Sequence, residues 1–223
     1  MKLFILSIAT LLSFFAANSQ VQFGLLAGAQ ATSADYTIGG KKQETSYKPG
    51  GQVGVNFKIP IEGRLSFAPQ LFYSMKGYKV KYNRFMYPPD GDAIDNNTTF
   101  HNVELALPLQ YDFSYSASHW FLRAGPSLDF QLFGREEFTT NSNGKIKRNI
   151  PFGYDKYGHY SANAVLHFGY EKSNGFFIYG QYTHGLANIS NTDEGPKIRH
   201  RAFGISFGKF IKKSKIVLDT RPI

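Results

Sequence analysis

Residues 103–115 read VELALPLQYDFSY, a stretch in which apolar and polar side chains alternate almost one by one. One set of alternate positions holds only Val, Leu, Tyr and Phe, while the other contains Glu104, Ala106, Gln110, Asp112 and Ser114. A helix, with about 3.6 residues per turn, would mix the two sets, whereas a β-strand points successive side chains to opposite faces. The stretch therefore predicts a strand with one apolar and one polar face.

The same alternation recurs along the chain. Strong copies cover residues 64–75 and 120–132, with apolar sets that include Leu71, Tyr73, Leu122, Leu128 and Phe130. Weaker copies cover residues 21–30, 51–59, 157–170, 176–189 and 197–210. Together with residues 102–115 they make about eight strands. Pro69 and Pro108 interrupt two of them, and we expect local bulges there because proline lacks the N–H donor that a strand ladder uses.

The connections between these strands alternate between long and short. The long ones are residues 31–49, 82–97 and 134–155, the short ones are 60–63, 116–118 and 172–175, and 190–196 is intermediate. Outer-membrane barrels have long external loops and short periplasmic turns, and their strands face lipid with apolar side chains. The pattern predicts an all-β protein, an eight-stranded antiparallel up-and-down transmembrane β-barrel over residues 20–210, in the outer membrane of a Gram-negative cell.

Both ends of the sequence lie outside this barrel. Residues 1–19 are typical of a signal peptide, with Lys2 before an apolar run and small residues before an expected cleavage after Ser19. Residues 211–223 are expected to form a basic periplasmic tail, with Lys212, Lys213 and Lys215.

The charge and the aromatic content indicate the kind of partner. The net charge is +9 and aromatic residues make up 16% of the chain. For an exported barrel, these values favour contact with outer-membrane lipid and lipopolysaccharide phosphates, with envelope proteins as a second class of partner. The sequence carries no nucleic-acid motif, so nucleic acid is not expected as a partner, and it predicts no cofactor.

The segment after residue 75 carries the candidate binding residues. Lys79 and Lys81 leave the barrel on the long-loop side, where their ammonium groups can contact lipopolysaccharide phosphates. Phe85 and Tyr87 follow, either as an exposed surface for a partner or as packing against neighbouring loops.

Several charged residues fall on the polar face that an eight-stranded barrel turns toward its narrow interior. They are Lys58, Arg64, Glu104, Asp112, Arg123 and Asp129. Such a lumen is filled by side chains, so we expect a polar plug rather than a diffusion pore, with a proton- or ligand-handling site as the alternative. Asp112 and Arg123 flank one short hairpin and are a candidate ion pair.

The histidines suggest an enzyme or a metal site only weakly. His167 and His200 fall on the lumen face, but no pair has metal-ligand spacing and no catalytic triad or carboxylate pair is present. We therefore expect a non-enzymatic protein. The rivals are a membrane-embedded enzyme with a reactive cluster at the outer rim, near His101 or His159, and a soluble barrel that carries an apolar ligand, against which the interior charges argue.

Short segments along the barrel carry a family resemblance. They read FGL at 23–25, APQLFYS at 68–74, VELALPLQY at 103–111, RAGP at 123–126 and FGISF at 203–207. In this order they resemble the outer-membrane β-barrel family of Bacteroidetes, often called PorT-like, over nearly the whole of residues 20–210. The resemblance implies an outer-membrane barrel and, as one alternative, a component that assists a protein secretion system. Such barrels usually end on an aromatic residue, whereas here a tail follows Phe210.

Overall fold

The computed structural model describes residues 21–83, 90–142 and 144–211. The expected signal peptide, the candidate residues Phe85 and Tyr87, and the expected tail beyond Ile211 lie outside the described residues.

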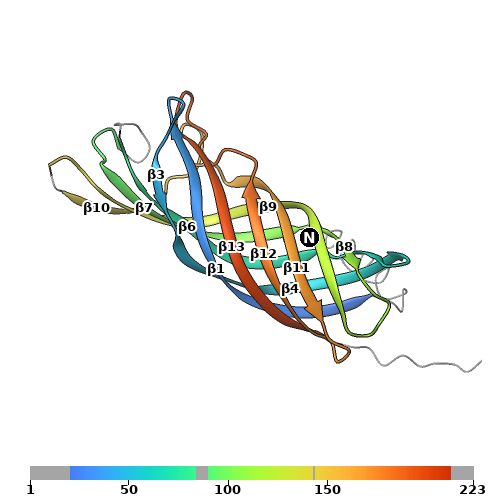
Figure 1. The fold of residues 1–223 in the computed structure, drawn as a ribbon. Helices are drawn as coiled ribbons and strands as arrows, with labels where there is room; N and C mark the ends of the chain where they lie inside the picture. Colours follow the sequence, from blue (N-terminus) through green and yellow to red (C-terminus); the bar gives the residue numbers. More distant parts are fainter. Residues whose placement is uncertain (1–20, 84–89, 143, 212–223) are drawn as a thin grey trace, which may run out of the picture.

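Eight long strands form a closed ring in which each strand pairs antiparallel with its neighbour (Figure 1). In ring order they are β1 (Gln22–Ile38), β4 (Lys48–Glu62), β6 (Gln70–Lys81), β7 (Asp95–Ala106), β9 (His119–Thr139), β11 (Tyr160–Glu171), β12 (Phe176–Gly185) and β13 (Lys197–Ile211). The ring follows chain order and closes where β13 pairs with β1, which leaves no open edge in the barrel. The predicted eight-stranded up-and-down barrel is confirmed.

Five shorter strands complete the sheet. β5 (Leu65–Phe67) and β8 (Leu109–Asp112) continue β6 and β7 toward the turn end, which is the end with the short connections. β2 (Lys41–Lys42), β3 (Glu44–Ser46) and β10 (Lys145–Asn149) lie at the opposite loop end, where β3 pairs with β6 and β10 pairs with β9. In Figure 1, β7 and β10 project beyond the ring at this end. No helix in the described residues is long and apolar enough to cross a membrane.

Pro69 and Pro108 interrupt their strands without shifting the register, so the expected bulges are wrong. The pairing of β5 with β8 continues into that of β6 with β7 at the same offset. Both prolines keep the hydrogen bond to their carbonyl oxygen, because Phe57 N donates to Pro69 O and Ala68 N donates to Pro108 O, both at 2.9 Å. Each proline therefore removes only its own donor from the ladder, and the strands need not slip.

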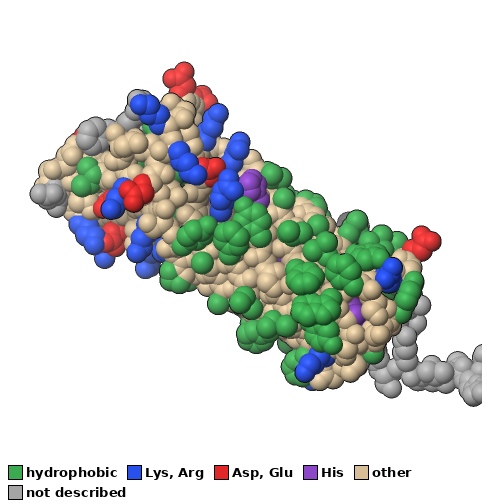
Figure 2. Space-filling view, viewed as in Figure 1, with side chains coloured by type: hydrophobic (Ala, Val, Ile, Leu, Met, Phe, Trp, Pro, Cys, Tyr) green, Lys and Arg blue, Asp and Glu red, His purple; other side chains and the backbone are tan. Residues whose placement is uncertain are grey.

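Exposed apolar side chains from strands all around the ring form a belt on the turn-side part of the barrel, and Figure 2 shows one face of it. Leu105 is 38% exposed on the outer surface, whereas its neighbour Glu104 is 1% exposed and faces the interior. The belt includes Leu25, Val53, Leu71, Leu128, Leu166, Ile178, Ile205 and Phe207. A membrane-spanning strand contacts lipid through such outward apolar side chains. The faces assigned from the alternation in residues 103–115 are therefore confirmed.

Beyond the belt, toward the loop end, the alternation reverses. In β6, Tyr78 and Val80 are buried while Lys79 and Lys81 are exposed. The buried set forms an apolar cluster inside the barrel with Tyr36, Ile38, Phe100, Ile150, Tyr157, Ile189 and Ile198. The strands therefore rise past the membrane as a water-facing barrel, so the long loops expected from residues 31 and 134 begin later than predicted.

Candidate functional site

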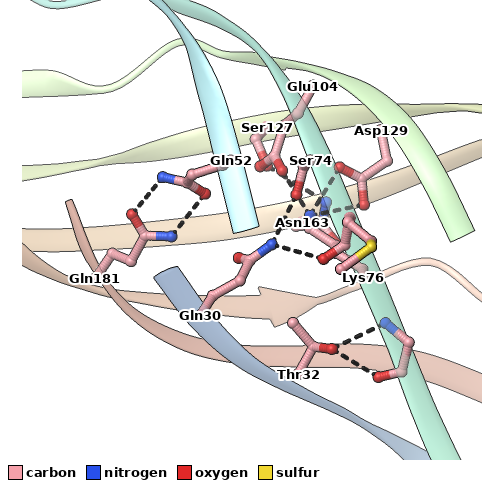
Figure 3. Close-up of polar contacts among 12 residues, drawn as sticks. Gln30, Thr32, Gln52, Ser74, Lys76, Glu104, Ser127, Asp129, Asn163 and Gln181 are labelled. Carbon is pink, nitrogen blue, oxygen red and sulfur yellow. Dashed lines mark hydrogen bonds and ion pairs between the residues drawn. The ribbon is translucent and has the colours of Figure 1, made fainter. Parts of the chain in front are cut away.

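Buried polar side chains fill the centre of the barrel (Figure 3). Lys76 Nζ donates to Glu104 Oε2 at 2.6 Å and to Asp129 Oδ1 at 2.9 Å. Gln52 and Gln181 donate to each other across the lumen, at 2.8 and 2.9 Å. Glu104 and Asp129, which were both predicted to face the lumen, thus share hydrogen bonds from a lysine of β6. This layer of bonded polar side chains is the polar plug that the sequence predicted.

A second ion cluster lies near the turn end. Lys58 Nζ lies 2.8 Å from Asp112 Oδ2 and 3.0 Å from Glu171 Oε2, with His119 beside both carboxylates. The cation paired with Asp112 is therefore Lys58, and not Arg123, the partner considered from the sequence.

Asp112 and Arg123 do not form an ion pair. Gln110 lies between them, because Arg123 Nε donates to Gln110 Oε1 and Gln110 Nε2 donates to Asp112 Oδ1, both at 2.5 Å. The Arg123 guanidinium instead lies over the ring of Phe121, 4.5 Å from its centroid. Register decides this outcome, since Gln110 is the residue opposite Arg123.

Arg64 was predicted to face the lumen, and this prediction is wrong. Its guanidinium lies over the outward rings of Tyr111 and Tyr115, 5.0 and 5.6 Å from their centroids, and donates to Phe113 O. Arg64 belongs to the turn between β4 and β5, where the strand alternation has not yet begun.

The histidines occupy separate places. His167 and His200 are buried on the lumen face as predicted, stacked on Tyr179 and packed edge-on against Phe100. His101 stacks on Phe133 on the outer wall, with ring centroids 4.4 Å apart. In the part of the chain that the structure describes, no group of His, Cys, Asp and Glu is placed to hold a metal ion.

The outer wall of the loop-end sheet carries a cationic cleft, formed on β3, β4, β6, β7, β9 and β10. It has two sections, of about 290 and 500 Å³, which share Asn97 and Glu137. The loop-end section also contains the predicted Lys79 and Lys81, while the belt-side section lies next to the apolar belt. The sequence-based prediction therefore named two residues of a larger charged surface.

In the loop-end section lysines and carboxylates are equal in number, and one of the carboxylates, Glu137, is shared with the belt-side section. The lysines are Lys79, Lys81 and Lys145, and the carboxylates are Glu44, Asp95 and Glu137. Lys145 forms an ion pair with Glu137, and hydrogen bonds from Lys145 and Lys147 hold the pKa of Glu137 below its ordinary value. Solvent screens such an exposed pair, so it adds little stability.

The belt-side section has an excess of positive charge. Lys48, Arg135, Lys147 and Arg148 line it with only two carboxylates, Glu136 and Glu137. Arg148 Nε lies 2.7 Å from Glu136, and Lys147 Nζ lies 3.1 Å from Glu137. Both acids are thus paired with other cations, and among the described residues neither Lys48 nor Arg135 forms an ion pair.

Lys48 reaches this section by crossing a neighbouring strand. An added Cβ at Gly77 in β6 would lie 3.2 Å from Lys48 Cδ, so the glycine leaves room for the lysine stem. The ammonium then donates to Asn97 Oδ1 at 2.6 Å, Thr98 O at 3.0 Å and Thr99 Oγ1 at 2.5 Å on β7. Burial lowers the pKa of Lys48 below its ordinary value, with the positive charge of Lys79 as a further cause.

The sequence reading missed Lys48 and Arg135. Both lie at or beyond the ends of the strands predicted from outward apolar residues, in the expected loops 31–49 and 134–155. Strand alternation resumes there with apolar residues such as Tyr36 and Phe138 on the inner face, but in β9 it resumes only after two consecutive exposed residues, Leu132 and Phe133, where the pairing with β7 shifts by one position. A strict period-two count from Asp129 would have placed Arg135 on the lumen face, so the alternation alone does not put this cation on the outer wall.

Comparison with known proteins agrees with the architecture. The sequence profile described as the outer membrane protein beta-barrel domain matches residues 15–191. A search of curated proteins finds no match.

Similar solved structures include three small outer-membrane proteins. Ail of Yersinia pestis is 9% identical, with 86% of this chain and 99% of that chain covered and a TM-score of 0.44. Neisserial surface protein A is 13% identical, with coverages of 86% and 97% and a TM-score of 0.44. OprG of Pseudomonas aeruginosa is 14% identical, with coverages of 86% and 96% and a TM-score of 0.45. Since the family profile matches well over half of its residues, the chain belongs to the outer membrane protein beta-barrel domain family and is a β-barrel protein of the outer membrane.

Proposed function

We propose that this protein is a non-enzymatic membrane anchor that holds the cationic cleft at the outer surface, where the cleft binds lipopolysaccharide of the outer leaflet. The observation that carries the proposal is the position of the cleft, directly beyond the apolar belt on the lipid-facing side of the wall. Lipopolysaccharide places phosphates at this depth, and basic residues beside a membrane surface attract anionic head groups.

The plugged interior supports an anchoring role over transport. The Gln52–Gln181 pair bridges the lumen between β4 and β12, and Lys76 with its two carboxylates fills the side of the lumen lined by the neighbouring strands β6, β7 and β9. An eight-stranded barrel has an interior just wide enough for side chains, and here those side chains are bonded to one another. The wall and loops are then the surfaces left for interaction with other molecules.

The proposal also assigns no catalytic step to the outer rim. His101 is hydrogen-bonded to Tyr73 and stacked on Phe133, and His159 is stacked on Phe152 with its Nδ1 3.0 Å from Gln131 O. Each imidazole thus has a packing role, and within the described residues neither is hydrogen-bonded to a serine, a cysteine or a carboxylate.

Lipopolysaccharide retention tests this function. The wild type and a variant with Lys48, Lys79, Lys81 and Arg135 replaced by Gln are placed in nanodiscs containing both phospholipid and lipopolysaccharide, and then extracted into detergent. We expect the wild type to retain lipopolysaccharide through washing and the variant to lose most of it. High salt should release the lipopolysaccharide that the wild type retains, because salt screens the attraction between the charges. Lys172→Gln, at the turn end, is the control. Equal retention by the wild type and the cleft variant would refute the proposal.

Within the family, we propose the PorT-like group of Bacteroidetes as the nearer kin of this chain. The support is the order of the segments at 68–74, 103–111 and 123–126. Envelope proteins are the partners that this placement favours, and crosslinking from Lys79 or Lys81 in intact cells followed by identification of the adducts tests it.

A further inference from the structure

We propose that the belt-side section of the cationic cleft is a built site for one phosphate monoester, formed by Arg135, Thr99 and the charge of Lys48. This inference deepens the proposed function and rests on it, because it names the chemical group that the cleft recognises. The site has three parts, which are a fixed charge, a polarised hydroxyl and a guanidinium.

Lys48 supplies the fixed charge. An ammonium group has three N–H donors, and here all three meet neutral oxygens, on Asn97, Thr98 and Thr99. Among the described residues, no carboxylate lies within ion-pair distance of Lys48, whose side chain is half-buried. Its position is therefore fixed by hydrogen bonds that leave its charge intact.

Thr99 converts that charge into a directed donor. Its Oγ1 accepts a hydrogen bond from Lys48, so the hydroxyl hydrogen remains free to donate toward the cleft. Asn97 is arranged in the same way, because its Oδ1 accepts from Lys48 and its amide N–H groups remain. A hydroxyl that accepts from a cation is polarised and becomes a stronger donor to an anion.

Arg135 supplies the second cation. It lies directly opposite Thr99 in the pairing of β7 with β9, which places their Cβ atoms about 4.5–5.5 Å apart. Its side chain is exposed and has no hydrogen bond or ion pair among the described residues. The planar guanidinium offers two parallel N–H bonds, the geometry that suits phosphate oxygens.

The local charge selects the class of ligand. Once Glu136 is paired with Arg148 and Glu137 with Lys147, two positive charges remain, on Lys48 and Arg135. A phosphate monoester carries about −1.5 to −2 charges and three strong acceptor oxygens, which matches this pair, whereas a carboxylate carries one charge. The ester can belong to the sugar head of a membrane lipid or to a soluble phosphorylated sugar.

Phosphate titration tests the site directly. The full chain is held in alkyl maltoside micelles, which contain no phosphate, and inorganic phosphate is titrated by calorimetry with acetate as the comparison anion. We expect phosphate to bind more tightly than acetate, and Arg135→Gln and Lys48→Gln to weaken phosphate binding at least about tenfold, since each removes a charged contact. Thr99→Val, which removes the hydroxyl at nearly constant shape, should weaken it about fivefold.

Lys147→Gln is the matched control, because Lys147 lines the same section but is paired with Glu137. It should bind phosphate within about twofold of the wild type. All variants must keep the heat-modifiable gel migration of a folded barrel. Equal phosphate affinity in the wild type, Arg135→Gln and Thr99→Val would overturn the inference, as would equal affinity for phosphate and acetate.

Lipid arms separate this inference from the proposed function and identify the source of the phosphate. Retention of intact but not dephosphorylated lipopolysaccharide, lost in Arg135→Gln, supports both and assigns the phosphate to the lipid. If lipopolysaccharide is retained equally by wild type and Arg135→Gln, the site is refuted while the broader function stands. If lipopolysaccharide is not retained but phosphate binds through Arg135, the function fails and the site stands, for a soluble ligand.

Discussion

Lys76 and Asp129 form a fully buried ion pair in the middle of the barrel, with Nζ 2.9 Å from Oδ1. Glu104 lies on the other side of the ammonium at 2.6 Å, so one lysine separates two carboxylates that face each other from β7 and β9. The energetic weight of this arrangement lies less in the attraction than in what remains if the lysine is removed.

Lys76→Met should destabilise the barrel by about 3–5 kcal/mol, because it leaves two buried carboxylates without a cation. Unfolding in urea, followed by the fluorescence of the single tryptophan, Trp120, measures the change. The triple variant Lys76→Met/Glu104→Gln/Asp129→Asn should recover most of the loss. If the single and triple variants are equally unstable, the plug is stabilised by shape rather than by charge.

Gly54→Ala should weaken the barrel by about 1–3 kcal/mol through overpacking. An added Cβ at Gly54 would lie 2.3 Å from Leu71 O and 2.3 Å from Phe72 Cβ, and backbone atoms cannot easily move aside. Gly180→Ala is the matched control, since its nearest neighbour, Phe168 O, is 4.0 Å away. Heat-modifiable gel migration after stepwise heating compares the two, and similar midpoints would contradict the packing described.

Leu105→Arg should cost about 2–4 kcal/mol in a lipid bilayer, the range for a charge near the centre of a lipid-facing strand. The same substitution at Tyr115, which is 80% exposed in a turn, should cost about 0–1 kcal/mol. Reversible folding into vesicles gives both values. A Leu105→Arg protein as stable as the wild type would mean that this face does not contact lipid.

Phosphate binding should decline at an alkaline pH below the ordinary lysine pKa. Burial lowers the pKa of Lys48 from 10.5, so its ammonium loses its proton, and the site one of its two positive charges, before an exposed lysine does. Lys48 is therefore charged at neutral pH, and its contribution to affinity is lost as the pH rises through the lowered pKa. Phosphate titrations from about pH 8 to about pH 11 measure the fall, which Lys48→Gln should lack. A wild-type affinity that is constant up to the ordinary lysine pKa would contradict the role of Lys48.

Much of the barrel could be predicted from the sequence because lipid requires every second residue of a membrane-spanning strand to be apolar. Leu105, Leu128 and Phe130 had to face outward, and the charges between them had to face inward. Proline was harder to interpret, since Pro108 can either bulge a strand or merely omit one donor. The retained bond to its carbonyl decides for the second outcome.

The cleft could be predicted only in part, for a different physical reason. Lys79 and Lys81 were visible as a cluster along the chain, whereas Lys48, Thr99 and Arg135 meet only through strand register and the space left by Gly77. Contacts between side chains on different strands depend on the register of strand pairing, which the residue pattern of one sequence does not reveal. For the same reason Gln110, rather than Asp112, proved to be the neighbour of Arg123.

Along β6 the outward side chains change from apolar to charged, and this change marks where the barrel wall leaves the lipid. Sinking the barrel further into the bilayer would immerse Lys79 and Arg135, while lifting it would expose Leu71 to water. Both displacements cost free energy, so the outward side chains of the barrel wall themselves fix its depth in the bilayer. A ligand held at Arg135 would accordingly be kept at one constant height above the lipid.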